Sequence, residues 1–262
     1  MRAVSSRHNP LVQMFREVAR GAGDARLLLD GVHLIRDAHS AGIALDTVAF
    51  SDALGDHTEA AGLLTDLERA GVDLVRVTQP VMTALSPMQA PSGIVAIGTR
   101  APADPASLVR DPRALLVIAV DVQDPGNLGA LVRAGEAGGA TGVLVCGQSA
   151  DPFSWKALRG SMGSALRLPV GILRTADAAL DLAEQHDVQT VAASPRAGVG
   201  PRDIDWRAPT ALLLGGEGPG LPDALLGRCR RLVTIPMQPP VESLNIAVAG
   251  ALLVYEARRQ RS

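Results

Sequence analysis

The chain has 262 residues, of which 47% are hydrophobic, and this length allows two domains or one large domain with a substantial core. Its formal net charge of −2 argues against a protein that coats nucleic acid through its overall field. The longest apolar run covers only about half of the roughly 20 residues that span a bilayer, and no signal-peptide core follows the charged N-terminus, so we expect a cytoplasmic protein outside the membrane.

The cysteines and histidines show no metal-binding spacing. Cys146 and Cys229 lie far apart, and Cys146 ends an apolar segment, so a buried thiol on a strand is expected there. The histidines are scattered and match no zinc pattern. We therefore expect no metal. The five histidines are His8, His33, His39, His57 and His186.

Basic residues gather in three groups, and almost all are arginine, with Lys156 the single lysine. The preference for arginine over lysine reflects either a compositional bias of the genome or a use of arginine for bidentate phosphate contacts. The last group also complements the dipole of a terminal helix, so structural and RNA-binding roles both stay open for it. Aromatic residues are only 2% of the chain, so base stacking on a Phe or Tyr platform is not expected. The groups are Arg2, Arg7, Arg16, Arg20 and Arg26; Arg228, Arg230 and Arg231; and Arg258, Arg259 and Arg261.

Residues 1–99 alternate helical and extended patterns, which predicts a small α/β domain. The clearest element is an amphipathic helix over Asn9–Arg20, with Pro10 in its first turn and an apolar stripe at Leu11, Val12, Phe15 and Val18. Strands are expected at 27–29, 47–50, 72–77 and 93–97, and further helices at 32–41 and 58–70.

Residues 100–113 contain three prolines and little apolar content, which predicts an interdomain linker. From residue 114 to 262 strands and helices alternate, a pattern typical of a parallel sheet covered by helices. Strands are expected at 115–120, 143–146, 188–192, 211–214 and 232–235, and helices at 128–137, 153–162, 176–185 and 243–259.

The first chemistry-bearing segment, residues 121–134, follows a strand and opens a helix, where open α/β sheets bind ligands. Gly126 and Gly129 allow close approach of a partner, and Asn127 supplies an amide. Arg133 stands in an otherwise apolar run, so we expect its charge to need a partner. Neither a G-x-G-x-x-G nor a Walker A pattern occurs here, which disfavours dinucleotide and nucleoside-triphosphate sites.

Two further segments lie at strand ends. In residues 212–222 a strand enters a glycine-rich turn around Glu217, which is either a plain tight turn or a backbone cradle for a ligand. In residues 235–249 a proline-broken loop leads into an apolar helix, for which Ser243 is the expected N-cap. Taken alone, this segment is better explained as an ordinary capped core helix.

Together the three segments resemble the SpoU-type (TrmH-like) RNA ribose 2′-O-methyltransferases of the SPOUT superfamily. The matching elements are N-x-G-x-x-x-R from Asn127 to Arg133, G-x-E-G-x-G-L from Gly215 to Leu221, and I-P-M…S-L-N from Ile235 to Asn245. The resemblance covers about residues 114–259. More weakly, residues 6–12 and 92–96 are similar to the substrate-binding domain of that family.

The resemblance implies an α/β fold whose C-terminal SPOUT domain, 114–262, has a parallel sheet and a deep trefoil knot, although knots are rare. It also implies a small N-terminal α/β RNA-binding domain over residues 1–99. A buried apolar helix at the C-terminus would form a homodimer interface. The implied activity is methylation of a ribose 2′-hydroxyl in structured RNA, foremost ribosomal RNA, with S-adenosyl-L-methionine as cofactor.

By the same resemblance, catalytic roles would fall to Arg133, Glu217, Ser243 and Asn245, with Asn127 in support. Cofactor-binding residues would be Gly215, Gly216, Ile235, Met237 and Leu244. A guanidinium rarely loses its proton, so we expect Arg133 to clamp phosphate and orient the hydroxyl rather than act as a base. Alternatives are a transfer RNA 2′-O-methyltransferase, a catalytically inert RNA-binding protein of the same fold, and a conventional nucleotide-dependent enzyme.

Overall fold

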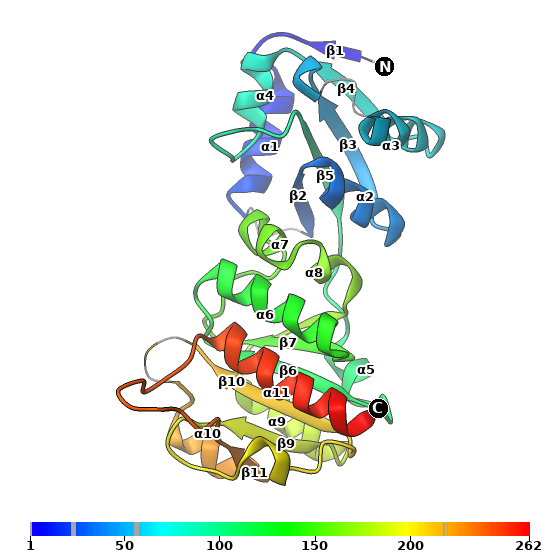
Figure 1. Cartoon of the computed structure of the whole chain (residues 1–262). Coiled ribbons are helices and arrows are strands. Elements are labelled where there is room, and N and C mark those ends of the chain that lie inside the picture. Colours follow the sequence, from blue (N-terminus) through cyan, green and yellow to red (C-terminus); the bar gives the residue numbers. More distant parts are fainter. Residues whose placement is uncertain (1, 22–24, 55–57, 217, 219) are drawn as a thin grey trace. The chain divides into compact units, whose positions relative to one another are not determined.

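A computed structural model describes residues 2–21, 25–54, 58–216, 218 and 220–262 (Figure 1). The chain forms two compact units. The first comprises Met1–Ala101 together with Phe153–Leu158, and the second comprises Pro102–Pro152 together with Arg159–Ser262. The main division thus falls after residue 101, and residues 153–158 return to the first unit.

The first unit is built on a five-stranded mixed sheet of order β1-β4-β3-β5-β2. β5 runs antiparallel to both β2 and β3, whereas β4 pairs in parallel with β1 and β3. The strands are β1 (Arg2–Val4), β2 (Arg26–Asp30), β3 (Ala44–Phe50), β4 (Asp73–Val77) and β5 (Ile94–Thr99); the helices are α1 (Pro10–Ala19), α2 (Val32–Ser40), α3 (Thr58–Arg69) and α4 (Gln79–Leu85), with a 3-10 turn η1 (Asp52–Leu54).

Helix α1 forms as its sequence predicts. The side chain of Asn9 caps it by accepting from the backbone N–H of Leu11, and Pro10 occupies its first turn. All four apolar residues of the predicted stripe are buried in the core of the first unit. The prediction missed β1 and α4, which are short and carry weak periodicity.

Residues 153–158 join the first unit because two aromatic side chains anchor them there. Trp155 is half-buried against the apolar core of that unit. The guanidinium of Arg100 lies over the Phe153 ring, 5.4 Å from its centroid. These contacts join residues about fifty positions apart in the chain, so local pattern could not place this segment.

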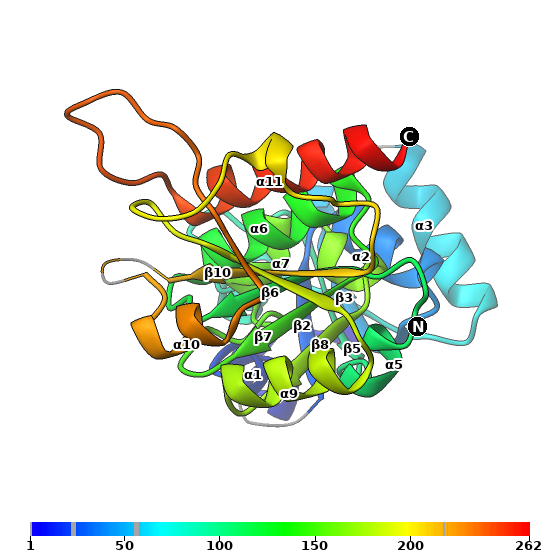
Figure 2. The same ribbon diagram turned by 90° about the horizontal axis from the view of Figure 1, so that it is seen from below.

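The second unit has a six-stranded sheet of order β11-β9-β10-β6-β7-β8, and every pair in it is parallel, which confirms the predicted parallel sheet. α6 and α11 cover one face, and α5, α9 and α10 cover the other (Figure 2). The strands are β6 (Leu115–Val120), β7 (Gly142–Cys146), β8 (Val170–Leu173), β9 (Gln189–Ala193), β10 (Thr210–Gly215) and β11 (Arg231–Val233); the helices are α5 (Pro105–Val109), α6 (Pro125–Gly138), α7 (Trp155–Ser161, shared with the first unit), α8 (Ser164–Arg167), α9 (Ala176–Gln185), α10 (Asp223–Arg228) and α11 (Ile246–Arg261), with a 3-10 turn η2 (Pro201–Asp203).

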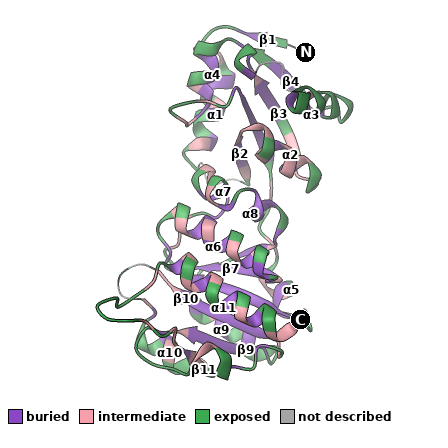
Figure 3. Ribbon diagram, in the orientation of Figure 1, coloured by how far each residue is buried: buried purple, intermediate pink, exposed green. Residues whose placement is uncertain are grey.

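The central strands β6, β7 and β10 are buried almost throughout, as their largely apolar sequences require (Figure 3). Cys146 is buried on β7, as predicted. α11 packs along α6, and the two helices approach closely at glycines: a Cβ on Gly138 would meet Val254, and one on Gly250 would meet Leu131. No helix in the described part of the chain is both long and apolar enough to cross a bilayer.

Residues 100–113 are more than the linker that was expected. Asp104 caps α5 by accepting from the N–H of Ala106, and Pro105 opens the helix. Leu108 and Val109 are buried in the core of the second unit. The prolines thus start a helix that packs on the sheet rather than keep the segment extended.

The two C-terminal arginine groups make structural contacts. Arg228 bridges Asp177 and Asp181, and Arg230 pairs with Asp187. In the last group, Arg261 donates to the backbone carbonyls of Trp206, Arg113, Ala114 and Ala208. Arg258 donates to the carbonyl of Ala137, and Arg259 pairs with Glu256. These contacts favour the structural role that was left open for the last group.

Candidate functional site

A cavity of about 770 Å³ opens at the carboxyl ends of the neighbouring strands β11, β9 and β10. Loops that follow parallel strands meet at one edge of the sheet, which is where α/β folds bind ligands. The predicted cofactor-binding residues Gly215, Gly216, Ile235, Met237 and Leu244 all line this cavity, together with Ser243 and Asn245. Segments separated by some 20 to 50 residues in the chain therefore share one site.

The two predicted glycines allow backbone to pack against backbone at the cavity wall. A Cβ on Gly215 would lie 2.5 Å from the carbonyl carbon of Gly220 and the nitrogen of Leu221. A Cβ on Gly216 would meet the backbone oxygen of Asp121. The Gly216 N–H donates to the carbonyl of Val120 at 2.7 Å, which ties the turn to β6. Glycine is required here by close approach rather than by flexibility.

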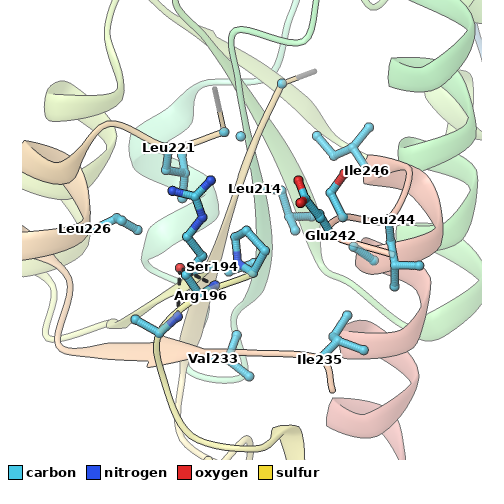
Figure 4. Close-up of a pocket in the computed structure, with 18 of the residues that line it drawn as sticks. Ser194, Arg196, Leu214, Leu221, Leu226, Val233, Ile235, Glu242, Leu244 and Ile246 are labelled. Carbon is cyan, nitrogen blue, oxygen red and sulfur yellow. Dashed lines mark hydrogen bonds between the residues drawn. The ribbon is translucent and has the colours of Figure 1, made fainter. Parts of the chain in front are cut away.

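The remaining wall is largely aliphatic, as expected of a site that holds an uncharged ring or chain. These side chains come from β10, β11, α10 and the loop before α11, and they surround the cavity (Figure 4). The labelled aliphatic residues are Leu214, Leu221, Leu226, Val233, Ile235, Leu244 and Ile246.

The sequence-based prediction missed three charged residues of the cavity, Arg196, Asp223 and Glu242. Arg196 and Glu242 lie on different sides of it (Figure 4). Arg196 belongs to the loop after β9, and the hydroxyl of Ser194 holds this loop by accepting from the N–H groups of Arg196 and Ala197, each at 3.3 Å. The loop follows a predicted strand, so its position in the parallel sheet was the signal that could have identified it.

The amide side chains of Asn127 and Asn245 form a direct link between two helices. Nδ2 of Asn245 donates to Oδ1 of Asn127 at 2.9 Å. Asn127 lies in the first turn of α6, whose N-cap Asp124 accepts from the Asn127 N–H at 2.7 Å. The helix thus begins earlier than predicted, at Pro125, because Asp124 and Pro125 form a good start signal.

Asn245, and not Ser243, is the N-cap of α11. Its Oδ1 accepts from the N–H groups of Ala247 at 2.9 Å and Val248 at 3.4 Å. The predicted cap was therefore wrong by two residues: an amide oxygen caps as well as a hydroxyl, and Asn245 immediately precedes the helix. Ser243 is exposed at the cavity, with its hydroxyl available to a ligand.

Arg133 is exposed on α6 and does not line the cavity. Its neighbours Leu131, Val132 and Gly135 are buried, so the apolar residues of this run occupy the other side of the helix. Solvent reaches the Arg133 guanidinium, which makes no hydrogen bond or ion pair with the other described residues. The partner expected for this charge stays a prediction. Glu217 lies outside the described residues.

Comparison with known proteins identifies this architecture. The SpoU rRNA Methylase family matches residues 114–255, which include the three motif segments. The chain belongs to this family. An uncharacterized tRNA/rRNA methyltransferase of Synechocystis is 33% identical over 99% of this chain and 94% of its own length. The 23S rRNA (guanosine(2553)-2′-O)-methyltransferase RlmP of Bacillus subtilis is 31% identical over 88% of each chain.

Solved structures of similar proteins match nearly all of the chain. The AdoMet-bound rRNA methyltransferase of Sinorhizobium meliloti has a TM-score of 0.88 at 27% identity, covering 98% of this chain and 97% of its own. The SpoU methyltransferase AviRb of Streptomyces viridochromogenes, in complex with AdoMet, has a TM-score of 0.88 at 26% identity, covering 97% and 98%. The predicted membership in the SpoU family and the enzyme class, an RNA methyltransferase, are thereby confirmed.

The described residues contain no group of three His, Cys, Asp or Glu side chains arranged as a metal site requires.

Proposed function

We propose that this SpoU-family member transfers the methyl group of S-adenosyl-L-methionine to a ribose 2′-hydroxyl of ribosomal RNA. The main support is the cavity at the strand ends, which is lined by the glycine turn, the proline-broken loop and the polar residues Ser243 and Asn245. The names of the relatives support the substrate class: RlmP acts on 23S rRNA, and a Streptomyces viridochromogenes relative, 31% identical, is a 23S rRNA (uridine(2479)-2′-O)-methyltransferase.

The cavity fits the proposed cofactor. Its volume of about 770 Å³ falls in the range of roughly 300–1,000 Å³ that small-molecule sites occupy. Backbone at Gly215 and Gly216 can supply hydrogen bonds to an adenine, and Ile235 and Leu244 can pack on its ring. A Cβ at either glycine would collide with neighbouring backbone atoms at the cavity wall. When bound, S-adenosyl-L-methionine supplies a methyl group made electrophilic by its sulfonium.

The protein's own residues must align and activate the 2′-hydroxyl, because in-line attack on such a methyl needs alignment rather than a metal. Asn245 is held by the α11 cap and by Asn127, so its position is fixed before RNA binds. Ser243 stands beside it with an available hydroxyl. We assign both to orienting the ribose, with Asn127 in support.

We assign Arg133 to clamping the phosphate next to the target ribose. A guanidinium stays protonated, so the hydroxyl proton passes to phosphate or water rather than to this side chain. The exposure of Arg133 suits a group that meets RNA from solvent. Glu217 would orient Arg133 or Asn245. Arg133→Lys separates the two roles: a base would retain activity at high pH, whereas a bidentate clamp would fail at every pH.

The proposal extends to topology and assembly. A deep trefoil knot would form where the segment between β11 and α11 threads the chain, an arrangement supported by the likeness to the SpoU structures.

A homodimer is supported by three exposed apolar side chains at helical spacing on α11, namely Val248, Leu252 and Tyr255, which are 48%, 50% and 51% exposed. The first unit would bind the RNA substrate.

Cofactor binding tests the proposal first. S-adenosylhomocysteine should raise the melting temperature, whereas NAD and ATP should leave it unchanged. A shift with NAD or ATP instead would point to a conventional nucleotide-dependent enzyme.

Mapping ribose methylation in cellular RNA with and without the gene then identifies the substrate. Loss of one 2′-O-methyl site in ribosomal RNA is the expected result. Loss in transfer RNA would favour the other substrate class, which the name of the Synechocystis relative also includes. An unchanged map would favour an inert RNA-binding protein.

A further inference from the structure

The N-terminal arginine group differs from the other two in how it is used. In the groups near residues 228–231 and 258–261, all the arginines except Arg231 are engaged by carboxylates or backbone carbonyls of their own unit among the described residues. In the first group Arg2 pairs with Asp73. Arg7, Arg16 and Arg20 pair with no carboxylate among the described residues, so their charge remains available at the surface.

Backbone carbonyls hold two of these guanidinium groups in place without neutralising them. Nε of Arg7 donates to the carbonyl of Pro80 at 2.9 Å, and Nε of Arg16 donates to the carbonyl of Ala84 at 3.2 Å. Both acceptors belong to α4, which packs beside α1. A guanidinium anchored through Nε keeps its terminal nitrogens free to form a bidentate contact with an anion.

A concave site of about 310 Å³ lies between the ends of these helices, entirely within the first unit. One side is formed by Arg16 and Ala19 of α1 and by Arg20, which caps that helix. Another side is formed by residues 83–87, at and just after the end of α4. Trp155 completes the lining. Its indole is half-buried against the core, and Nζ of Lys156 lies 5.5 Å from the ring centroid.

We propose that this site binds one unpaired RNA nucleotide, with its base stacked on Trp155 and its phosphate held by Arg16 and Arg20. An aromatic ring beside cationic groups is the arrangement with which proteins hold single-stranded nucleic acid. The low aromatic content excluded a platform of stacked bases, but one indole in a basic pocket suffices for a single base. The proposal rests on the proposed function, since it assigns part of the RNA substrate to the first unit.

Tryptophan fluorescence of the full chain tests the stacking directly. The only other tryptophan, Trp206, is fully buried and donates from Nε1 to the carbonyl of Pro201 at 2.8 Å. Quenching by RNA at the surface therefore reports on Trp155. Titration with an octauridylate should quench the emission, whereas a blunt RNA duplex of the same length should not. Equal quenching by both probes, or none by either, would overturn the proposal.

Binding of a fluorescently labelled octauridylate measures the contribution of each side chain. Trp155→Leu should weaken the Kd by roughly 10-fold or more, as loss of base stacking does elsewhere. Arg16→Ala with Arg20→Ala should weaken the Kd and reduce the slope of log K against log salt by about 0.7, the value for one phosphate contact on a single strand. The matched control is Arg69→Ala, since Arg69 pairs with Asp66 on the exposed surface of the same unit.

Three outcomes contradict the inference: unchanged RNA affinity in both variants, an equal loss in the control, or tighter binding of an acidic peptide than of the octauridylate, which would indicate a protein partner. The S-adenosylhomocysteine melting shift of each variant should match that of the unaltered chain, which shows that the second unit is intact. If no RNA is methylated but the octauridylate results hold, the proposed function fails and this site stands. If RNA is methylated and both variants have an unaltered KM for RNA, the proposed function stands and the proposed nucleotide site fails.

Discussion

Asn245 donates from Nδ2 to Oδ1 of Asn127 at 2.9 Å across a sequence separation of 118 residues. The same side chain caps α11 through its Oδ1. One amide therefore fixes the start of the last helix and joins it to the first turn of α6. Because Asn245 also faces the cavity, the structural and the proposed catalytic roles of this residue overlap. These two roles can be separated by substitutions that remove either the accepting oxygen or the donating nitrogen of the side chain.

Asn245→Ala should lower the free energy of unfolding by about 2 kcal/mol, since it removes an N-cap worth about 1 kcal/mol and one further hydrogen bond of similar size. Asn245→Asp keeps the capping oxygen and replaces the donor to Asn127 with a carboxylate oxygen. It should stay within about 1 kcal/mol of the unaltered chain while methyl transfer falls strongly. Urea denaturation and a methyl-transfer assay measure the two effects. Full activity of the aspartate variant would rule out a role for the amide donor.

Gly216→Ala should destabilise the protein by about 1–3 kcal/mol and weaken binding of S-adenosylhomocysteine, because the new Cβ would meet backbone at Asp121 that cannot rotate away. Gly227→Ala in α10 is the matched control, since a Cβ there meets nothing within 4 Å. The control should be neutral or slightly stabilising. Calorimetric titration and thermal unfolding compare the pair, and equal behaviour would contradict the close packing inferred for the glycine turn.

Arg261→Met should cost about 3 kcal/mol of stability, because it removes the donors to four backbone carbonyls, one of them Trp206 O at 2.6 Å. Arg259→Ala, two positions earlier, breaks only an exposed pair with Glu256 and should change stability by less than about 1 kcal/mol. Denaturant midpoints of the two variants test the contrast. A similar small effect in both would show that the hydrogen bonds of Arg261 to backbone contribute little to stability.

Both thiols should resist alkylation in the folded protein. Burial raises the pKa of Cys146 to about 12, and the negative charge of Asp121 adds to the effect. Burial also raises the pKa of Cys229 to about 11. Because a raised pKa leaves little thiolate below these values, iodoacetamide at pH 8 should label neither residue within the time that labels a free thiol in urea. Rapid labelling of Cys146 without denaturant would contradict its burial.

Leu252→Glu should convert the proposed dimer to a monomer without loss of folding, since Leu252 is 50% exposed on α11 and its burial would occur only between subunits. Ile172→Glu is the control, because that side chain is also exposed, at 44%, but lies on β8. Gel filtration with light scattering distinguishes the two masses. A monomeric unaltered chain would remove the basis for a homodimer.

The sequence determined most elements and the composition of the cavity. Buried parallel strands are apolar throughout, so β6 was predicted with its observed ends, and the stripe of α1 was recognised from its period alone. The glycine turn and the proline-broken loop were both recognised because backbone chemistry restricts these residue types locally. Their shared position followed once the sheet was known to be parallel, since parallel strands bring their carboxyl ends to one edge.

Only the tertiary structure decided which distant groups meet. It paired Asn127 with Asn245, placed Arg196 in the cavity, and returned Trp155 to the first unit. It also showed that α11 is capped by Asn245 rather than Ser243 and that Arg261 donates to backbone carbonyls. Each of these depends on strand order and helix packing, which place residues tens of positions apart in contact. Local pattern carries information on which face of an element is buried, but none on what that face or its ends will touch.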